Sequence, residues 1–282
     1  MKKIFNFILL IGSLALWGCD NFDEDEYKTF QSSELTESTE ITAFQNHQVV
    51  LLEDYTGWGC VNCPAAAAKI NELQAKYGNK LIAMGVHAGT FAKPGKSNNF
   101  QDFRTIYGEK WNTLFGITSY PSGLINRLSF GSSKIVGKDD WDSKINETLN
   151  YTDYKMNINL GAEKKDSYIL VSAQYQILKD INNSLSANVL VIEDGIKGVQ
   201  LNSDAAYGNV PKITDYVFNH VLRTNGQIDL SLGENFSAND ALTKNYKINI
   251  DSSWNLAKCK VVVFVANTEN GEVVQCNEVT IK

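Results

Sequence analysis

The sequence has few cysteines, few basic residues and no long apolar run. Five cysteines in 282 residues are too few for a disulfide scaffold. No apolar run reaches the roughly 18 residues that a bilayer-spanning helix needs, which excludes a transmembrane helix. Lys and Arg total 26 against 32 Asp and Glu, a formal net charge of −6. This balance excludes most nucleic-acid binding, because a phosphate backbone demands a basic face.

The composition is otherwise that of a folded protein, with 43% apolar and 21% charged residues and enough length for two ordinary domains. The acidity is unevenly placed. Residues 20–40 contain eight acidic residues and one Lys, whereas the preceding segment carries two Lys, which leaves residues 41–282 nearly neutral. Such an acidic stretch repels itself, so we expect an extended, solvated tether.

The N-terminus reads as a targeting segment. Residues 1–3 are a short basic region, and residues 4–16 form an apolar core of about thirteen residues, too short for a membrane helix. Leu16-Trp17-Gly18-Cys19 resembles the lipobox of bacterial lipoproteins. The resemblance implies that residues 1–18 are a signal peptide and that Cys19 is lipidated at the head of a 19–40 tether. A conventional signal peptide with a chance cysteine is the alternative.

The acidic run after Cys19 also resembles the surface-export signals of Bacteroides-type lipoproteins. This resemblance implies a protein held by lipid at the cell outer membrane, on its periplasmic or its surface-exposed face. A lipid of this kind holds a protein on the membrane without spanning it.

A CxxC segment carries the chemistry. Residues 47–55 read as a buried strand and residues 56–59 as a turn, followed by Cys60-Val61-Asn62-Cys63-Pro64 and a helix from Ala65 to Tyr77. A first-turn proline costs nothing, and Gly78 is a typical helix stop. A cysteine at a helix N-terminus is favoured as a thiolate. We therefore expect an exposed Cys60 to attack and an inward-facing Cys63 to resolve the mixed disulfide.

The CxxC allows two other interpretations. A zinc site needs four ligands, and the sequence has neither a second CxxC nor a nearby pair of histidines. A structural, redox-silent disulfide on the same fold is the serious rival to exchange chemistry.

Strand, turn, Cys60-Val61-Asn62-Cys63 and helix resemble the active-site segment of the thioredoxin superfamily. The resemblance implies that Asp54, six residues before Cys60, assists deprotonation of the resolving cysteine, although Glu53 competes for that role. It also implies a substrate-binding place for Trp58, yet Gly59 separates this residue from Cys60. Val61-Asn62 replaces the family's usual Gly-Pro. Both departures leave the reduction potential of the cysteine pair undetermined, because the residues between the cysteines help to set it.

The next segments fit the same family. Residues 80–87 read as a second buried strand ending in His87, which is either a polar strand-end residue or a group near the cysteines. An insertion loop over 89–99 and a helix from about 100 to 111 follow. Tyr120-Pro121 then resembles the family's cis-proline loop, which implies that Pro121 lies against the disulfide and Tyr120 contacts the substrate chain. A trans proline in an ordinary turn is the alternative. A closing helix over about 138–149 would end the domain.

From residue 154 the pattern changes to period two, with strands expected at 154–160, 168–177, 187–192, 246–250, 259–265 and 273–281. About 125 residues of such strands predict an antiparallel, immunoglobulin-like β-sandwich. A turn at Asn270-Gly271 would not place Cys259 opposite Cys276, which favours two buried thiols over a disulfide. His220 reads as a packing residue.

The two halves together resemble the 28-kDa outer-membrane lipoprotein family of Bacteroides-type bacteria. The residues that carry this resemblance are 51–57, Cys60 to Pro64, 118–123, Glu193-Asp194-Gly195 and Asn219-His220-Val221-Leu222-Arg223. It implies an α/β thioredoxin-like domain over 41–152 fused to a β-sandwich over 153–282. It implies little about biochemistry.

The leading hypothesis is therefore a lipid-anchored thiol–disulfide oxidoreductase acting on exported protein thiols. Cys60 attacks, Cys63 resolves, Asp54 or Glu53 relays a proton, and Pro121 with Tyr120 positions the substrate. No dissociable cofactor and no metal is needed, although a redox partner must recycle the pair. The rival is a surface binding protein or adhesin, in which the sandwich or residues 93–99 grip a ligand and the disulfide braces the fold.

Overall fold

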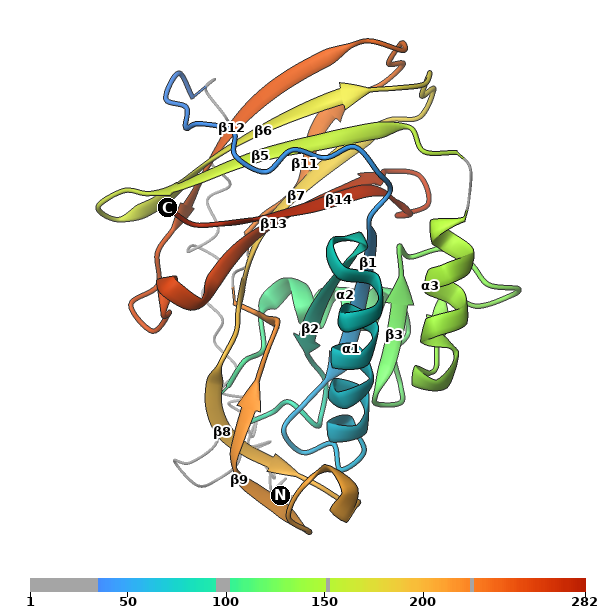
Figure 1. Cartoon of the computed structure of the whole chain (residues 1–282), viewed down its shortest axis with the longest axis vertical. Coiled ribbons are helices and arrows are strands. Elements are labelled where there is room, and N and C mark those ends of the chain that lie inside the picture. The colour runs from blue at the N-terminus through green and yellow to red at the C-terminus, as the bar shows by residue number, and fades with distance from the viewer. Residues whose placement is uncertain (1–34, 95–101, 151–152, 224–225) are drawn as a thin grey trace, which may run out of the picture. The chain divides into compact units, whose positions relative to one another are not determined.

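The computed structural model describes residues 35–94, 102–150, 153–223 and 226–282. The predicted signal peptide, Cys19, the tether up to residue 34 and residues 95–99 of the insertion loop lie outside the described residues. The described protein is mostly β-strand with few helices (Figure 1). Among the described residues, no helix is long and apolar enough to cross a membrane.

The first half of the described chain mixes strands with all three α-helices described. Its elements are β1 (Val50–Thr56), α1 (Cys63–Tyr77), β2 (Leu81–His87), α2 (Ile106–Leu114), β3 (Ser122–Ile125), β4 (Ile135–Val136) and α3 (Trp141–Leu149). The predicted strands before and after the CxxC helix are confirmed as β1 and β2, and they pair in parallel. The peptide bond between Tyr120 and Pro121 is cis, as predicted.

The second half is built almost entirely of strands. They are β5 (Met156–Lys164), β6 (Tyr168–Ile177), β7 (Leu185–Glu193), β8 (Ile196–Leu201), β9 (Lys212–Phe218), β10 (Val221–Leu222), β11 (Gln227–Gly233), β12 (Ala241–Asn249), β13 (Cys259–Asn267) and β14 (Val273–Thr280). The sequence pattern predicted β5, β6, β7, β12, β13 and β14. It missed β8 to β11, whose side chains alternate less regularly between buried and exposed.

One sheet runs through both halves, in the order β14-β13-β7-β10-β2-β1-β3-β4, with β11 also paired to β7. The short strand β10 makes the connection: Val221 pairs with Gly85 of β2, and Leu222 pairs with Ile192 of β7. A second sheet has the order β12-β6-β5, and β8 pairs with β9 as a separate two-stranded sheet. Alternating apolar side chains of β5, β6, β7 and β13 share one core between the two larger sheets.

The two faces of β1 enter different cores. Val50 and Leu52 pack with the apolar side of α1 and with Trp141 and Ile145 of α3. Leu51 and Tyr55 point to the opposite face, toward α2 and the β7–β13 strands. This alternation places Asp54 on the α1 side and Glu53 on the other side.

The structure differs from two of the sequence expectations. Helix α2 begins at Ile106, because the Thr105 hydroxyl accepts a hydrogen bond from the Gly108 N–H and so caps it; residues 102–105 are not helical. Residues 35–40, which the sequence predicts to be part of a solvated tether, pack on the three-stranded sheet. There the N–H of Thr39 donates to Ser172, and Gly161 leaves space for the Glu40 backbone. The last hairpin has a bulge near its turn, where the β13–β14 register shifts between Val265 and Ala266.

Cys259 and Cys276 are free and buried, as predicted. Phe264, not Cys259, pairs with Cys276 in the β13–β14 register. The two thiols also lie in different cores, on opposite faces of this strand pair.

Candidate functional site

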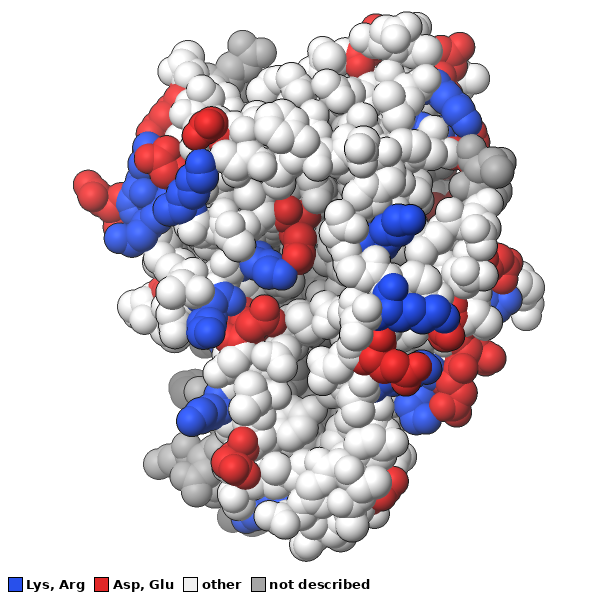
Figure 2. Space-filling model, in the orientation of Figure 1, with Lys and Arg blue, Asp and Glu red and all other residues white. Residues whose placement is uncertain are grey.

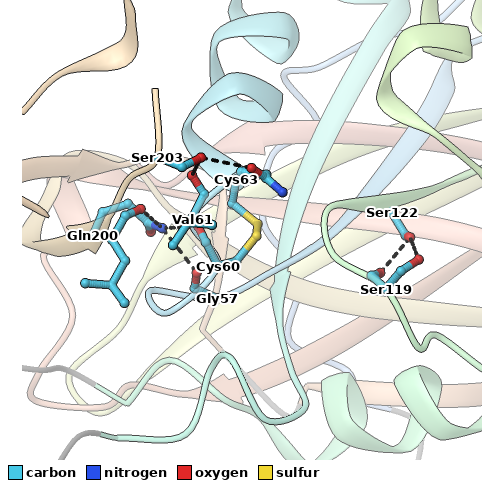
Figure 3. The surroundings of a disulfide bond; sticks show 10 residues. Gly57, Cys60, Val61, Cys63, Ser119, Ser122, Gln200 and Ser203 are labelled. Carbon is cyan, nitrogen blue, oxygen red and sulfur yellow. Dashed lines mark hydrogen bonds between the residues drawn. A yellow bond between two sulfur atoms is a disulfide. The ribbon is translucent and has the colours of Figure 1, made fainter. Parts of the chain in front are cut away.

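The CxxC lies at the start of α1, and its two cysteines form a disulfide (Figure 3). Cys63 is the first helical residue and Pro64 follows it, where the ring removes an N–H that has no helical partner. The side chains of Ala66, Ile70 and Leu73 anchor the helix on the sheet. The disulfide therefore sits at the positive end of a well-packed helix.

Both cysteines are buried, which corrects the expectation of an exposed Cys60. Cys60 is 2% exposed and Cys63 is 3% exposed. Two segments contribute to this cover. The N–H of Gly59 donates to the Phe91 carbonyl at 2.9 Å, which holds the loop after β2 over the turn. The β8–β9 hairpin also contacts the segment, through hydrogen bonds of Gln200, Leu201 and Ser203.

The hairpin binds the CxxC segment through its backbone carbonyls. The Nε2 of Gln200 donates to the Cys60 carbonyl at 2.8 Å and to the Gly57 carbonyl at 3.3 Å (Figure 3). The N–H of Leu201 donates to the Trp58 carbonyl at 2.8 Å.

A second set of bonds continues along the segment. The N–H of Ser203 donates to the Val61 carbonyl at 3.1 Å, and its hydroxyl lies 3.0 Å from the Asn62 side-chain oxygen (Figure 3). Sequence reasoning missed Gln200 and Ser203, because nothing in their local pattern connects them with a motif 140 residues earlier.

Asp54 lies beneath the helix start and is 4% exposed. Its Oδ1 has no hydrogen-bond partner among the described residues. Burial raises the pKa of this carboxyl from 3.8 to about 7. Asp54 lines a cavity of about 460 Å³ together with Cys63, His87 and Gln200. The structure therefore brings the predicted acid and the predicted resolving cysteine to one cavity.

Glu53 lies on the opposite face of β1 and is fully buried. Arg127 donates to both of its carboxylate oxygens, at 2.7 and 2.8 Å. The guanidinium is 4.6 Å from the ring centroid of Trp111 and 4.9 Å from that of Phe264. Strand alternation thus separates the two candidate acids: Asp54 faces the cysteine side and Glu53 is held in an ion pair.

Pro121 lines a groove of about 450 Å³ with Val61, Asn62, Lys138 and Tyr207. The groove therefore runs between the cis-proline loop, the CxxC and the β8–β9 hairpin. Its lining comes from segments that are far apart in the sequence.

The two aromatic residues predicted to bind substrate make bonds elsewhere. Tyr120 donates its hydroxyl proton to Asn112 at 2.5 Å and contacts the ring of Phe91 edge-on. The indole N–H of Trp58 donates to the Lys93 carbonyl at 2.7 Å. Both side chains fix loops beside the disulfide, and neither lines the groove at Pro121.

His87 ends β2 and is buried, with its ring edge-on to Phe103 and Phe218 at centroid distances of 5.1 and 5.5 Å. Burial lowers the pKa of this imidazole from 6.5 to about 3, so it is neutral in the folded protein at neutral pH. It lines the same cavity as Asp54 and Cys63. Within the described ranges, no cluster of three or more His, Cys, Asp or Glu side chains could hold a metal ion.

Solved structures with the same overall arrangement are known. HBP35 of Porphyromonas gingivalis matches with a TM-score of 0.62 and 16% identity, over 84% of this chain and 76% of that one. A protein of Agrobacterium tumefaciens matches with a TM-score of 0.50 and 14% identity, over 83% of this chain and 95% of that one. At these identities the likeness concerns the fold alone.

A domain of the outer membrane lipoprotein Omp28 from Porphyromonas gingivalis is 24% identical over 46% of this chain and 90% of that one, with a TM-score of 0.30. None of the curated proteins matches the chain. The sequence profile of one family, Outer membrane protein Omp28, matches residues 109–282, which is more than half of the chain. This match agrees with the outer-membrane localisation expected from the sequence. The chain therefore belongs to the Omp28 family of outer membrane proteins.

Proposed function

We propose that residues 41–152 form a thioredoxin-like domain and residues 153–282 an immunoglobulin-like β-sandwich, held at the outer membrane by lipid on Cys19. Three features support the first assignment: the parallel β1–α1–β2 unit, the disulfide at the start of α1 and the cis bond before Pro121. The shared core between two layers of antiparallel strands supports the second.

The function we propose is thiol–disulfide exchange with exported proteins. The observation that carries it is Asp54, a buried carboxyl with an unpartnered oxygen in the cavity that Cys63 also lines. A buried carboxyl without a partner lowers stability. A disulfide that only braces the fold gains nothing from such a carboxyl. A resolving cysteine, in contrast, needs a proton donor and acceptor beside it.

In this reaction a substrate thiolate attacks the Cys60 sulfur. The Cys60–Cys63 bond breaks, a mixed disulfide forms, and the electron pair leaves on Cys63 as a thiolate, which takes the Asp54 proton. A second substrate thiolate then attacks the substrate sulfur of the mixed disulfide and releases the Cys60 thiolate. The substrate is oxidised to a disulfide and the CxxC pair gains two electrons. The reverse sequence reduces a substrate disulfide, and a second redox protein restores the starting state.

The test is the reduction potential of the Cys60–Cys63 pair together with its exchange rate on a reduced, unfolded model protein. We expect a potential within the roughly −270 to −120 mV range of catalytic pairs. Asp54→Asn should slow exchange at least tenfold near pH 7 without changing the structure, because the Cys63 thiolate then lacks its proton source. Asp140→Asn, which changes an exposed carboxyl just before α3, is the matched control. An equal rate in Asp54→Asn and wild type would contradict the proposal.

A surface binding protein with a structural disulfide is the second candidate, and the burial of both cysteines favours it. A structural disulfide of this kind has a potential below about −300 mV or resists reduction until the protein unfolds. Either result would replace exchange by binding of a surface ligand as the proposed function.

A further inference from the structure

The β8–β9 hairpin stands apart from both larger sheets, and its base is fixed by two short motifs. The N–H of Gly195 donates to the Asn219 side chain at 3.0 Å, and the N–H of His220 donates to the Asp194 side chain at 2.7 Å. Gly195 and His220 both have positive φ, so the chain turns sharply as it enters and leaves the hairpin. The two motifs thus form a clamp around residues 196–218.

Apolar packing is concentrated at that base. Phe218 packs with Phe103 and Val221 beside the clamp. The cavity of about 460 Å³ extends from this base to Ala206 and Tyr207 and lies between the hairpin and α1. Beyond the base, hydrogen bonds of Gln200, Leu201 and Ser203 tie the hairpin to the CxxC segment. A segment held by a few hydrogen bonds over a cavity opens at lower free energy than one packed on a core.

The hydrogen bonds tie the hairpin to the backbone around Cys60, the cysteine that an attacking thiolate must reach. Gln200 is 1% exposed and bonds to the carbonyl of Cys60 itself. Cys60 is covered although its neighbour Val61 is 39% exposed. An attacking thiolate must come into line with the S–S bond. Figure 3 shows Gln200 and Ser203 of the hairpin beside the backbone of this segment, bonded to its carbonyl groups and to Asn62.

We propose that the β8–β9 hairpin is a cap that must lift before the Cys60–Cys63 disulfide reacts, and that Gln200 is the positioning residue that holds it shut. This inference rests on the proposed exchange function for its biological meaning. The physical claim concerns access to the disulfide. The hairpin pivots at the Asp194–Gly195 and Asn219–His220 clamp while its outer end leaves the CxxC segment.

The experiment measures the rate at which dithiothreitol reduces the disulfide in the full chain held in mild detergent, by alkylation and peptide mapping of Cys60 and Cys63. One dithiothreitol thiolate attacks Cys60, Cys63 leaves as a thiolate, and the second thiolate closes the oxidised dithiothreitol ring and releases Cys60. Because Gln200→Ala removes two hydrogen bonds to the CxxC segment, we expect reduction about tenfold faster than in wild type. Ser203→Ala should give about a two- to threefold increase.

Lys197→Gln, an exposed change on the same strand, is the matched control and should leave the rate unchanged. Reduction in 8 M urea removes the cap from every variant, so all rates should converge there. Equal native rates in Gln200→Ala, Ser203→Ala and wild type, with folded spectra, would overturn the cap. A Gln200→Ala that is reduced faster but transfers no electrons to a model protein would uphold the cap and contradict the exchange function.

Discussion

The two neighbouring acids of β1 have opposite surroundings. Glu53 is fully buried and bonded twice to Arg127, whereas Asp54 is buried with an oxygen that has no partner. One residue step along the strand separates an ion pair enclosed by aromatic rings from an acid in a cavity beside a disulfide. Burial alone therefore does not mark a functional acid. The difference is whether the surrounding fold satisfies it.

The largest loss of stability should come from breaking the buried ion pair between Glu53 and Arg127. Arg127→Met leaves the Glu53 carboxylate buried without a partner, which should cost about 3–5 kcal/mol of unfolding free energy in urea titrations. The double variant Glu53→Leu/Arg127→Met should recover most of that loss, because replacing both charges removes the uncompensated one. A double variant no more stable than the single one would show that the ion pair itself is needed.

The cavity that holds Asp54 and His87 should make the stability of the protein depend on pH. The pKa of Asp54 is raised from 3.8 to about 7, so its contribution to stability is complete below pH 3.8 and is lost as the pH rises through 7. The pKa of His87 is lowered from 6.5 to about 3, so its contribution is present above pH 6.5 and is lost as the pH falls toward 3. Between pH 3.8 and 6.5 the two slopes, each up to about 1.4 kcal/mol per pH unit, oppose each other.

Single substitutions should therefore reveal opposite slopes. Asp54→Asn should make stability rise from pH 4 to 6.5 and should stabilise the protein at pH 8 by up to about 4 kcal/mol. His87→Phe should make stability fall over the interval from pH 4 to 7. Urea titrations at half-unit pH steps give both curves. If the unfolding free energy of both variants is independent of pH over this range, the raised pKa of Asp54 and the lowered pKa of His87 are contradicted.

Removing the disulfide should have a smaller effect. Because the loop it closes is only a few residues long, Cys60→Ser/Cys63→Ser should lower the unfolding free energy by about 2 kcal/mol. If the disulfide instead holds the hairpin, the cis-proline loop and α1 together, its removal should lower the unfolding free energy by more than this. It should also increase hydrogen exchange in the strand that carries Gln200. The calorimetric Tm and the exchange rates at β8 measure these two outcomes separately.

The sequence pattern predicted the CxxC helix and its two flanking strands because local rules determine them: an apolar run, a first-turn proline and a glycine stop. The cis bond before Pro121 was predicted from the family resemblance and not from the pattern, and the structure confirms it together with the two free thiols that the turn register favoured. The choice between Glu53 and Asp54 stayed open, because period two tells that adjacent residues face opposite sides but not which side holds the cysteines. The hairpin over the disulfide could not be predicted, since Gln200 contacts Cys60 across 140 residues of chain.

The same reasoning extends to the second pair of cysteines, where the expected effect is smallest. Burial raises the pKa of Cys259 to about 12 and that of Cys276 well above the usual range of a thiol. A thiol alkylates through its thiolate, so iodoacetamide at pH 8 should modify neither residue in the folded protein and both in urea. Because these thiols lie in separate cores, oxidation should not join them. Rapid labelling of Cys259, the less buried of the two, would mean that β13 opens at the end next to η5 (Leu256–Lys258). The reactive pair Cys60–Cys63 and the inert thiols Cys259 and Cys276 would then differ only in degree.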